Sequence, residues 1–332
     1  MRRLAPVIVL LATAGSVAAE TPPPWRGIAV GLHSKVEAWS YRPQLEEALA
    51  LGANAVSLLV PLRMRDVRSS TVEGMGVEAP ALAAVAAEAR AMKLDVFLIP
   101  YIQLDVITDD EWRGTLAPGD WEAWWASYTR MVLELARFAA RHDVALFAVG
   151  SELCSAERFT SRWLALIGQV REVYSGTLTY SANWDHLEPV GFVGALDVVG
   201  MNAYFELGRS EEASLEELLD AWHKLRPAIR RWVDAQRKPL VFTEVGYPSR
   251  AGGARWPWDY TREAEVDTAI QATAYEAFLS SWWRDPRVEG VFFYELWGEG
   301  GPSDPGYTPR GKPAAESLRR HYRERAESDT AR

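Results

Sequence analysis

Two glutamates follow apolar segments that have the composition of buried strands. Glu244 comes after the apolar residues 240–242, and Glu152 comes after the apolar segment 146–150. Such short apolar runs are typical of strands in a fully covered parallel sheet. Burying a carboxylate costs several kcal/mol unless it is paired and hydrogen-bonded, so two such placements indicate a functional demand. The two segments predict one site with paired carboxylates.

Paired carboxylates are suited to the hydrolysis of a glycosidic bond. One carboxylic acid protonates the leaving oxygen, and one carboxylate faces the anomeric carbon. A separation of about 5 Å allows direct attack and retention of configuration, whereas a wider gap admits water and inverts it. For a single glutamate, a helix cap or an ion pair is an equal alternative. The pair, with aromatic residues near it, favours catalysis.

The elements that must position these glutamates alternate along the chain. The short connection between 182 and 198 leaves little room for a helix. This order predicts an α/β fold, a (β/α)8 TIM barrel in a single domain. Strands are expected at 27–32, 55–60, 94–100, 146–150, 178–182, 198–201, 240–245 and 291–296, and helices at 42–51, 81–92, 121–138, 163–174, 215–233, 263–283 and 314–323.

In such a barrel the active site lies at the C-terminal ends of the strands. The residues expected there are carboxylates, amides and aromatics, which suit a neutral, hydroxyl-rich ligand. We expect Tyr204 to hydrogen-bond Glu244, and Trp297 to form the floor of a sugar subsite. The candidate substrate-binding residues at strand ends are His33, Tyr101, Asn183, Trp184, Asn202, Tyr204, Tyr247, Glu295 and Trp297.

Composition excludes several other classes of function. The net charge of −9 and the pI near 5.3 argue against a nucleic-acid or anionic-membrane partner. The five histidines show no HxH or HExxH spacing, so we predict no metal site and no cofactor. The GxGxxA string at 74–79 follows a polar loop and is interpreted as a turn. Cys154, the only cysteine, is interpreted as a buried spectator.

The N-terminus has the pattern of a signal peptide. Arg2 and Arg3 precede an apolar segment at 4–14, and small residues follow up to Ala19. We therefore expect residues 1–19 to be a signal peptide and residues 20–332 to be the catalytic domain. The mature protein is expected to be periplasmic or extracellular, without membrane association, and monomeric.

Several segments resemble glycoside hydrolase family 113, within clan A of the retaining glycoside hydrolases. They include GSEL at 150–153, VGMNAY at 199–204 and FTEVGYP at 242–248. Similar stretches occur at 39–41, 52–56 and 112–114, so the resemblance runs through nearly the whole mature chain.

The resemblance implies a retaining endo-β-1,4-mannanase that acts on mannan-type polysaccharides or oligosaccharides. It implies that Glu152 is the acid/base and that Glu244 is the nucleophile. It also implies sugar contacts from Arg113, Asn202, Tyr204 and Trp297. Two departures are present: Ser151 stands where the clan commonly has Asn, and Tyr101 stands where related barrels often carry His.

Two alternatives stay open at the level of sequence. A β-1,4-glucanase or a galactanase would use the same two glutamates. A non-catalytic glycan-binding barrel would keep the aromatic residues for sugar contact, with the carboxylates supporting the rim.

Overall fold

The computed structural model describes residues 25–34, 39–108, 110–188 and 190–330, so the expected signal peptide lies outside the described residues. Within them, eight parallel strands close into a barrel, because β1 pairs with both β2 and β9. The barrel strands are β1 (Trp25–Gly31), β2 (Ala55–Met64), β4 (Asp95–Leu104), β5 (Leu146–Ser151), β6 (Thr177–Ala182), β7 (Val199–Asn202), β8 (Leu240–Val245) and β9 (Val288–Phe293). The predicted (β/α)8 barrel is confirmed.

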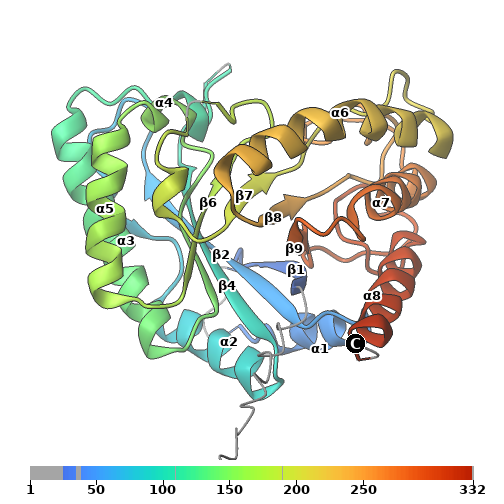
Figure 1. Cartoon of the computed structure of the whole chain (residues 1–332), viewed down its shortest axis with the longest axis horizontal. Coiled ribbons are helices and arrows are strands. Elements are labelled where there is room, and N and C mark those ends of the chain that lie inside the picture. The colour runs from blue at the N-terminus through green and yellow to red at the C-terminus, as the bar shows by residue number, and fades with distance from the viewer. Residues whose placement is uncertain (1–24, 35–38, 109, 189, 331–332) are drawn as a thin grey trace, which may run out of the picture.

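Helices surround this barrel and connect its strands (Figure 1). In the described part of the β6–β7 connection the only helical element is the 3-10 turn η2 (Val193–Ala195), as its length predicted. The α-helices are α1 (Arg42–Ala50), α2 (Ala79–Ala91), α3 (Trp121–Arg141), α4 (Cys154–Glu157), α5 (Thr160–Val173), α6 (Leu215–Gln236), α7 (Thr268–Trp282) and α8 (Ala314–Thr330).

Side chains on the two faces of the strands form two separate apolar clusters. Successive residues of a strand point to opposite faces. Val96 and Leu98 of β4 belong to the larger cluster, which includes the helices, whereas Phe97 and Ile99 belong to a smaller cluster made by strand residues and Trp25. The smaller cluster therefore fills the inside of the barrel, where the rings of Phe97 and Phe292 lie 5.0 Å apart.

Several boundaries differ from those expected, among them those of the last strand, of helix α7 and of the segment expected as a turn. The last strand, β9, ends at Phe293 rather than at 296, so Glu295 follows it. Helix α7 begins at Thr268 rather than at 263, because the Asp267 side chain caps it by accepting from the amides of Ala269 and Ile270. The segment expected as a turn begins with the two-residue strand β3 (Gly74–Met75), which pairs antiparallel with β2.

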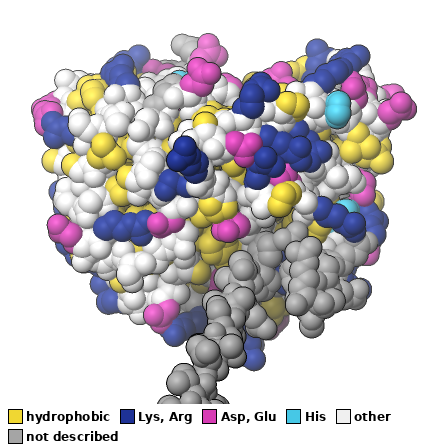
Figure 2. Space-filling model, in the orientation of Figure 1, with side chains coloured by type: hydrophobic (Ala, Val, Ile, Leu, Met, Phe, Trp, Pro, Cys, Tyr) yellow, Lys and Arg dark blue, Asp and Glu magenta, His cyan; other side chains and the backbone are white. Residues whose placement is uncertain are grey.

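The surface is of mixed charge on the face that Figure 2 shows, where Lys and Arg side chains are interspersed with Asp and Glu. Among the described residues, no helix combines the length and the hydropathy that crossing a bilayer requires. Where its residues are described, the face that Figure 2 shows therefore has no large patch of one charge sign.

Candidate active site

Glu152 lies directly after β5, in a turn with an uncommon backbone conformation. Its φ is 55°, in the left-handed region, which costs a non-glycine residue about 1 kcal/mol or more. Two hydrogen bonds from β6 hold this turn. The Glu152 amide donates to the Ser181 carbonyl (2.9 Å), and the Leu153 amide donates to the Tyr180 hydroxyl (2.8 Å). The carboxylate is thus aimed by a fixed backbone.

The Glu152 carboxylate is buried and has two partners. Its Oε2 accepts from Arg113 Nη1 at 2.6 Å, and its Oε1 accepts from Asn202 Nδ2 at 2.9 Å. Arg113 begins the 3-10 turn η1 (Arg113–Thr115), and its guanidinium lies 5.3 Å from the centre of the Tyr101 ring. The structure therefore gathers three residues expected to contact sugar around Glu152.

Glu244 projects from β8 beside the same asparagine. Its Oε2 accepts a hydrogen bond from the Tyr204 hydroxyl at 2.8 Å, which is the contact expected from the sequence. Asn202 is the residue that pairs with Glu244 in the β7–β8 ladder. The Thr243 hydroxyl donates to Asn202 Oδ1 at 2.7 Å, which orients the amide nitrogen toward Glu152. Asn202 thus lies between the two glutamates, and these converge on one site.

Electrostatics link the two glutamates. Burial, and then the negative charge of Glu152, raises the pKa of Glu244 to about 8, although the Tyr204 hydrogen bond and the charge of Arg113 act in the opposite direction. Burial also raises the pKa of Tyr204 well above its ordinary value, so this phenol keeps its proton and acts as a donor. Near neutral pH the Glu244 carboxyl is therefore protonated more readily than an isolated glutamate.

A further carboxylate, Glu295, lies beyond the end of β9 and is paired with a histidine. Glu295 Oε2 lies 3.0 Å from His33 Nε2, and the His33 ring meets the Trp297 ring edge-on at 5.3 Å. A Cβ on Gly31 would lie 2.2 Å from both polar atoms, so only glycine leaves room for this pair at the end of β1. Trp39, which is exposed, lies 6.5 Å from Trp297.

Three candidate residues are not gathered with the glutamates. Tyr247 is fully buried, with its ring 6.2 Å from that of Tyr275 in α7. Asn183 donates to Asp185 at 2.7 Å, and the Trp184 ring lies 5.4 Å from the Phe205 ring. Their predicted contact with substrate stays a prediction.

The sequence analysis missed two tyrosines that stand behind Tyr204. The rings of Tyr294 and Tyr307 each lie 6.4 Å from the Tyr204 ring and 5.3 Å from each other. A Cβ on Gly246 would lie 3.0 to 3.2 Å from these three tyrosines, so the glycine permits their close approach. No local pattern marks Tyr307, because it comes from the loop between β9 and α8.

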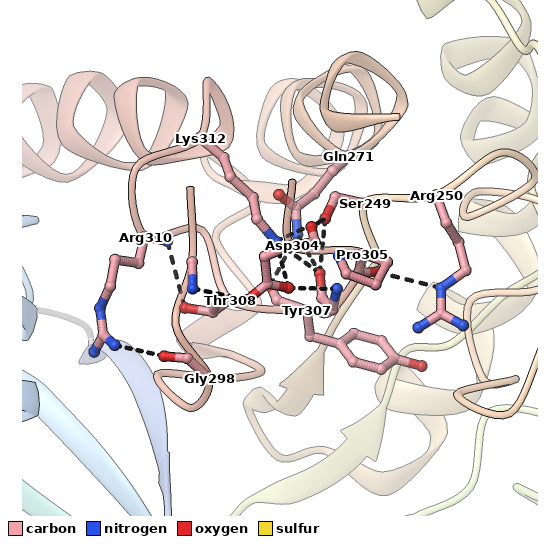
Figure 3. A network of polar contacts seen from close by, with 12 residues as sticks. Ser249, Arg250, Gln271, Gly298, Asp304, Pro305, Tyr307, Thr308, Arg310 and Lys312 are labelled. Carbon is pink, nitrogen blue, oxygen red and sulfur yellow. Dashed lines mark hydrogen bonds and ion pairs between the residues drawn. The ribbon is translucent and has the colours of Figure 1, made fainter. Parts of the chain in front are cut away.

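A buried polar network holds that loop (Figure 3). Lys312, whose side chain is fully buried, donates to the Ser249 hydroxyl at 2.6 Å and pairs with Asp304 at 3.3 Å. The Gln271 amide donates to the carbonyls of Tyr247 (3.0 Å) and Tyr307 (2.9 Å). The network joins the segments that follow β8 and β9, and so it holds the tyrosines behind Glu244.

Cys154 lies two residues after Glu152 and is partly exposed, not fully buried as expected. Burial, and then the negative charges of Glu157, Glu152 and Asp185, raises the pKa of the thiol. A thiol that keeps its proton is a poor nucleophile. This chemistry agrees with a spectator role in hydrolysis.

Several solved structures are similar to the chain, and GH113 β-mannanases are among them. The GH113 β-mannanase AaManA from Alicyclobacillus acidocaldarius is 28% identical, with a TM-score of 0.81 and coverage of 93% of this chain and 100% of that chain. A GH113 β-1,4-mannanase is 25% identical, with a TM-score of 0.79 and coverage of 91% and 99%. The β-D-glucuronidase of Dictyoglomus thermophilum, at 14% identity and a TM-score of 0.64, shares the fold over 91% of this chain and 51% of its own.

No curated protein matches the chain. The family model described as Glycoside Hydrolase Family 113 matches residues 36–301, which is most of the chain. The barrel, the strand-end carboxylates and these matches agree, and the substrate is a carbohydrate. The chain belongs to Glycoside Hydrolase Family 113 and is a glycoside hydrolase.

Proposed function

We propose that the protein is a retaining endo-β-1,4-mannanase that cleaves β-1,4-mannosidic bonds in mannan-type polysaccharides. The observation that carries this proposal is the placement of Glu152 and Glu244 on either side of Asn202. The β-mannanase names of the similar GH113 structures support the choice of mannan.

The proposed reaction is a double displacement by the two glutamates. Glu244 attacks the anomeric carbon while Glu152 protonates the departing oxygen, which leaves a glycosyl ester on Glu244. Glu152 then removes a proton from water, and the water oxygen displaces Glu244 from the sugar. The first step needs Glu152 protonated and Glu244 ionised, so the surroundings of the two carboxyl groups must favour that state once the substrate is bound.

The partners of the glutamates support these roles. Tyr204 donates to Glu244 and stabilises it as the attacking carboxylate. Asn202 and Arg113 orient Glu152, and both can contact the sugar once its ring lies between the glutamates. The chemistry needs no metal or cofactor, because proton transfer and nucleophilic attack both come from carboxyl groups.

Export and assembly are part of the same proposal. The charged start, apolar segment and small residues at 1–19 support a signal peptide, with residues 20–332 as the exported catalytic domain. Action on a polymeric substrate fits a periplasmic or extracellular site. We propose that the enzyme is a monomer, which size-exclusion chromatography with light scattering would test.

The test compares reducing-sugar release from β-1,4-mannan, glucomannan, β-glucan and galactan. Wild type is set beside Glu244→Gln, with Glu289→Gln on β9 as a matched control because Glu289 lies on the exposed side of a barrel strand. We expect release from the mannans alone, lost in Glu244→Gln and kept in Glu289→Gln. Release chiefly from β-glucan or galactan would assign the alternative hydrolases.

A second experiment tests the covalent step. A 2-fluoro mannoside with a good leaving group slows the second displacement, so a glycosyl group should remain on Glu244 and be found by peptide mass spectrometry. An inverted product and an unlabelled Glu244 would refute the mechanism. Sugar binding without release, unchanged in Glu244→Gln, would identify a glycan-binding barrel.

A further inference from the structure

A cluster of three side chains lies next to the catalytic turn but takes no part in the proposed reaction. Cys154 and Glu157 come from α4, and His186 follows β6. The Cys154 sulfur, a Glu157 carboxylate oxygen and a His186 ring nitrogen all lie within 4.8 Å of one another. The topology thus brings three different metal-ligating groups together from separate segments.

The burial of this cluster leaves it open on one side. Glu157 is fully buried, Cys154 is partly exposed, and the His186 side chain is 38% exposed. A cation can therefore reach the three groups from solvent, with Glu157 at the closed end. Three protein ligands and one remaining position for water form a tetrahedral set.

The donor chemistry selects the class of cation. Thiolate and imidazole ligands with one carboxylate suit zinc and similar thiophilic divalent ions, whereas magnesium and calcium prefer oxygen ligands alone. The main charges that act on the Cys154 thiol come from Glu157, Glu152 and Asp185, and all three are acidic. This field attracts a divalent cation.

We propose that Cys154, Glu157 and His186 form a binding site for a thiophilic divalent cation such as zinc, and that its occupation inhibits the enzyme. Binding would displace the thiol proton and the proton shared by Glu157 Oε2 and His186 Nδ1, and both would pass to solvent. The metal then forms bonds to sulfur, oxygen and nitrogen, with no change of oxidation state.

Inhibition follows from the hydrogen bonds below the site and rests on the proposed role of Glu152. Glu157 Oε2 lies only 2.6 Å from His186 Nδ1, whereas ligand atoms around zinc lie on the order of 3.5 Å apart. The cation therefore separates the Glu157 carboxylate from the His186 ring, and the proposed inhibition requires that the carboxylate moves. Glu157 Oε1 also accepts from Tyr180, and the Tyr180 hydroxyl accepts from the Leu153 amide beside Glu152. Movement of Glu157 thus releases the strained turn that aims Glu152.

The first measurement is a cobalt titration of the full protein, since cobalt reports sulfur ligation by a thiolate-to-metal charge-transfer band. We expect one cobalt per chain with this band in wild type and no band in Cys154→Ser. Zinc affinity by calorimetry should fall about tenfold or more in Cys154→Ser and in His186→Gln. His321→Gln is the matched control, because His321 also lies near a glutamate, 3.4 Å from Glu276 Oε1, but has no thiol among the contacts that the structure describes.

The second measurement is turnover against zinc concentration. We expect wild type and His321→Gln to lose activity over the range in which calorimetry shows binding, and Cys154→Ser to keep it. A missing band in wild type would overturn the site. Equal zinc sensitivity in Cys154→Ser would overturn the inhibition and would point to the His33–Glu295 pair instead. If no polysaccharide were cleaved, the cobalt band would still test the site, so the two proposals fail separately.

Discussion

Replacing Glu244 by Gln should stabilise the protein against unfolding, and the gain should grow with pH. The pKa of Glu244 in the folded protein, about 8, lies above its ordinary value of 4.5. Between these values the folded protein binds more protons than the unfolded chain, so its stability falls as pH rises through this window. Gln keeps the position of the acceptor for Tyr204 but cannot ionise, so the variant escapes this loss.

Each pH unit inside the window can lower the free energy of unfolding by about 1.4 kcal/mol at most. We therefore expect Glu244→Gln to be close to wild type at pH 5 and more stable by a few kcal/mol at pH 9. Urea unfolding at pH 5, 7 and 9 measures the difference. Glu134→Gln, at an exposed position of α3, is the control for loss of a charge. Parallel stability profiles for wild type and Glu244→Gln would refute the assignment of the proton to a buried, repelled carboxylate.

Three further substitutions test the surroundings of the pair. Tyr204→Phe removes the donor to Glu244 and should lower kcat about 10- to 100-fold, because a hydrogen bond to a charged group contributes about 1.5–3 kcal/mol. An unchanged kcat would contradict this role. Gly31→Ala should displace the His33–Glu295 pair and raise KM about tenfold in steady-state assays. Lys312→Met leaves the partly buried Asp304 without its cation and should cost about 2 kcal/mol in urea unfolding, whereas a cost below about 0.5 kcal/mol would show that the network does not hold the loop.

The sequence alone determined the barrel and its two central carboxylates. Buried parallel strands carry a local signal, because apolar runs of five or six residues alternate with helical periodicity in Trp121–Arg141 and Leu215–Gln236. A glutamate at the end of such a run is conspicuous because its burial needs a reason. Glu152 and Glu244 could therefore be found without any knowledge of their contacts.

One residue that the sequence analysis grouped with the glutamates lies just beyond its strand. Strand β8 ends at Val245, so the loop that follows, and not the alternation of strand faces, sets the direction of the Tyr247 side chain. Tyr247 is three residues beyond Glu244, and its ring packs against α7 instead of joining the pair. Asn202 and Tyr204, two residues apart, both reach the glutamates.

Only the tertiary structure decided which partners the loop residues have in the site, although the family resemblance had already picked out Arg113 as a sugar contact. Arg113 reaches Glu152 from the β4–α3 connection, and Tyr307 reaches Tyr204 from the β9–α8 loop. Neither position has a periodic pattern, since loop conformation depends on distant contacts such as the pairing of Lys312 with Asp304. The raised pKa of Glu244 was equally hidden from sequence, because burial and the charge of Glu152 act on it only when two strands far apart in the chain are brought together.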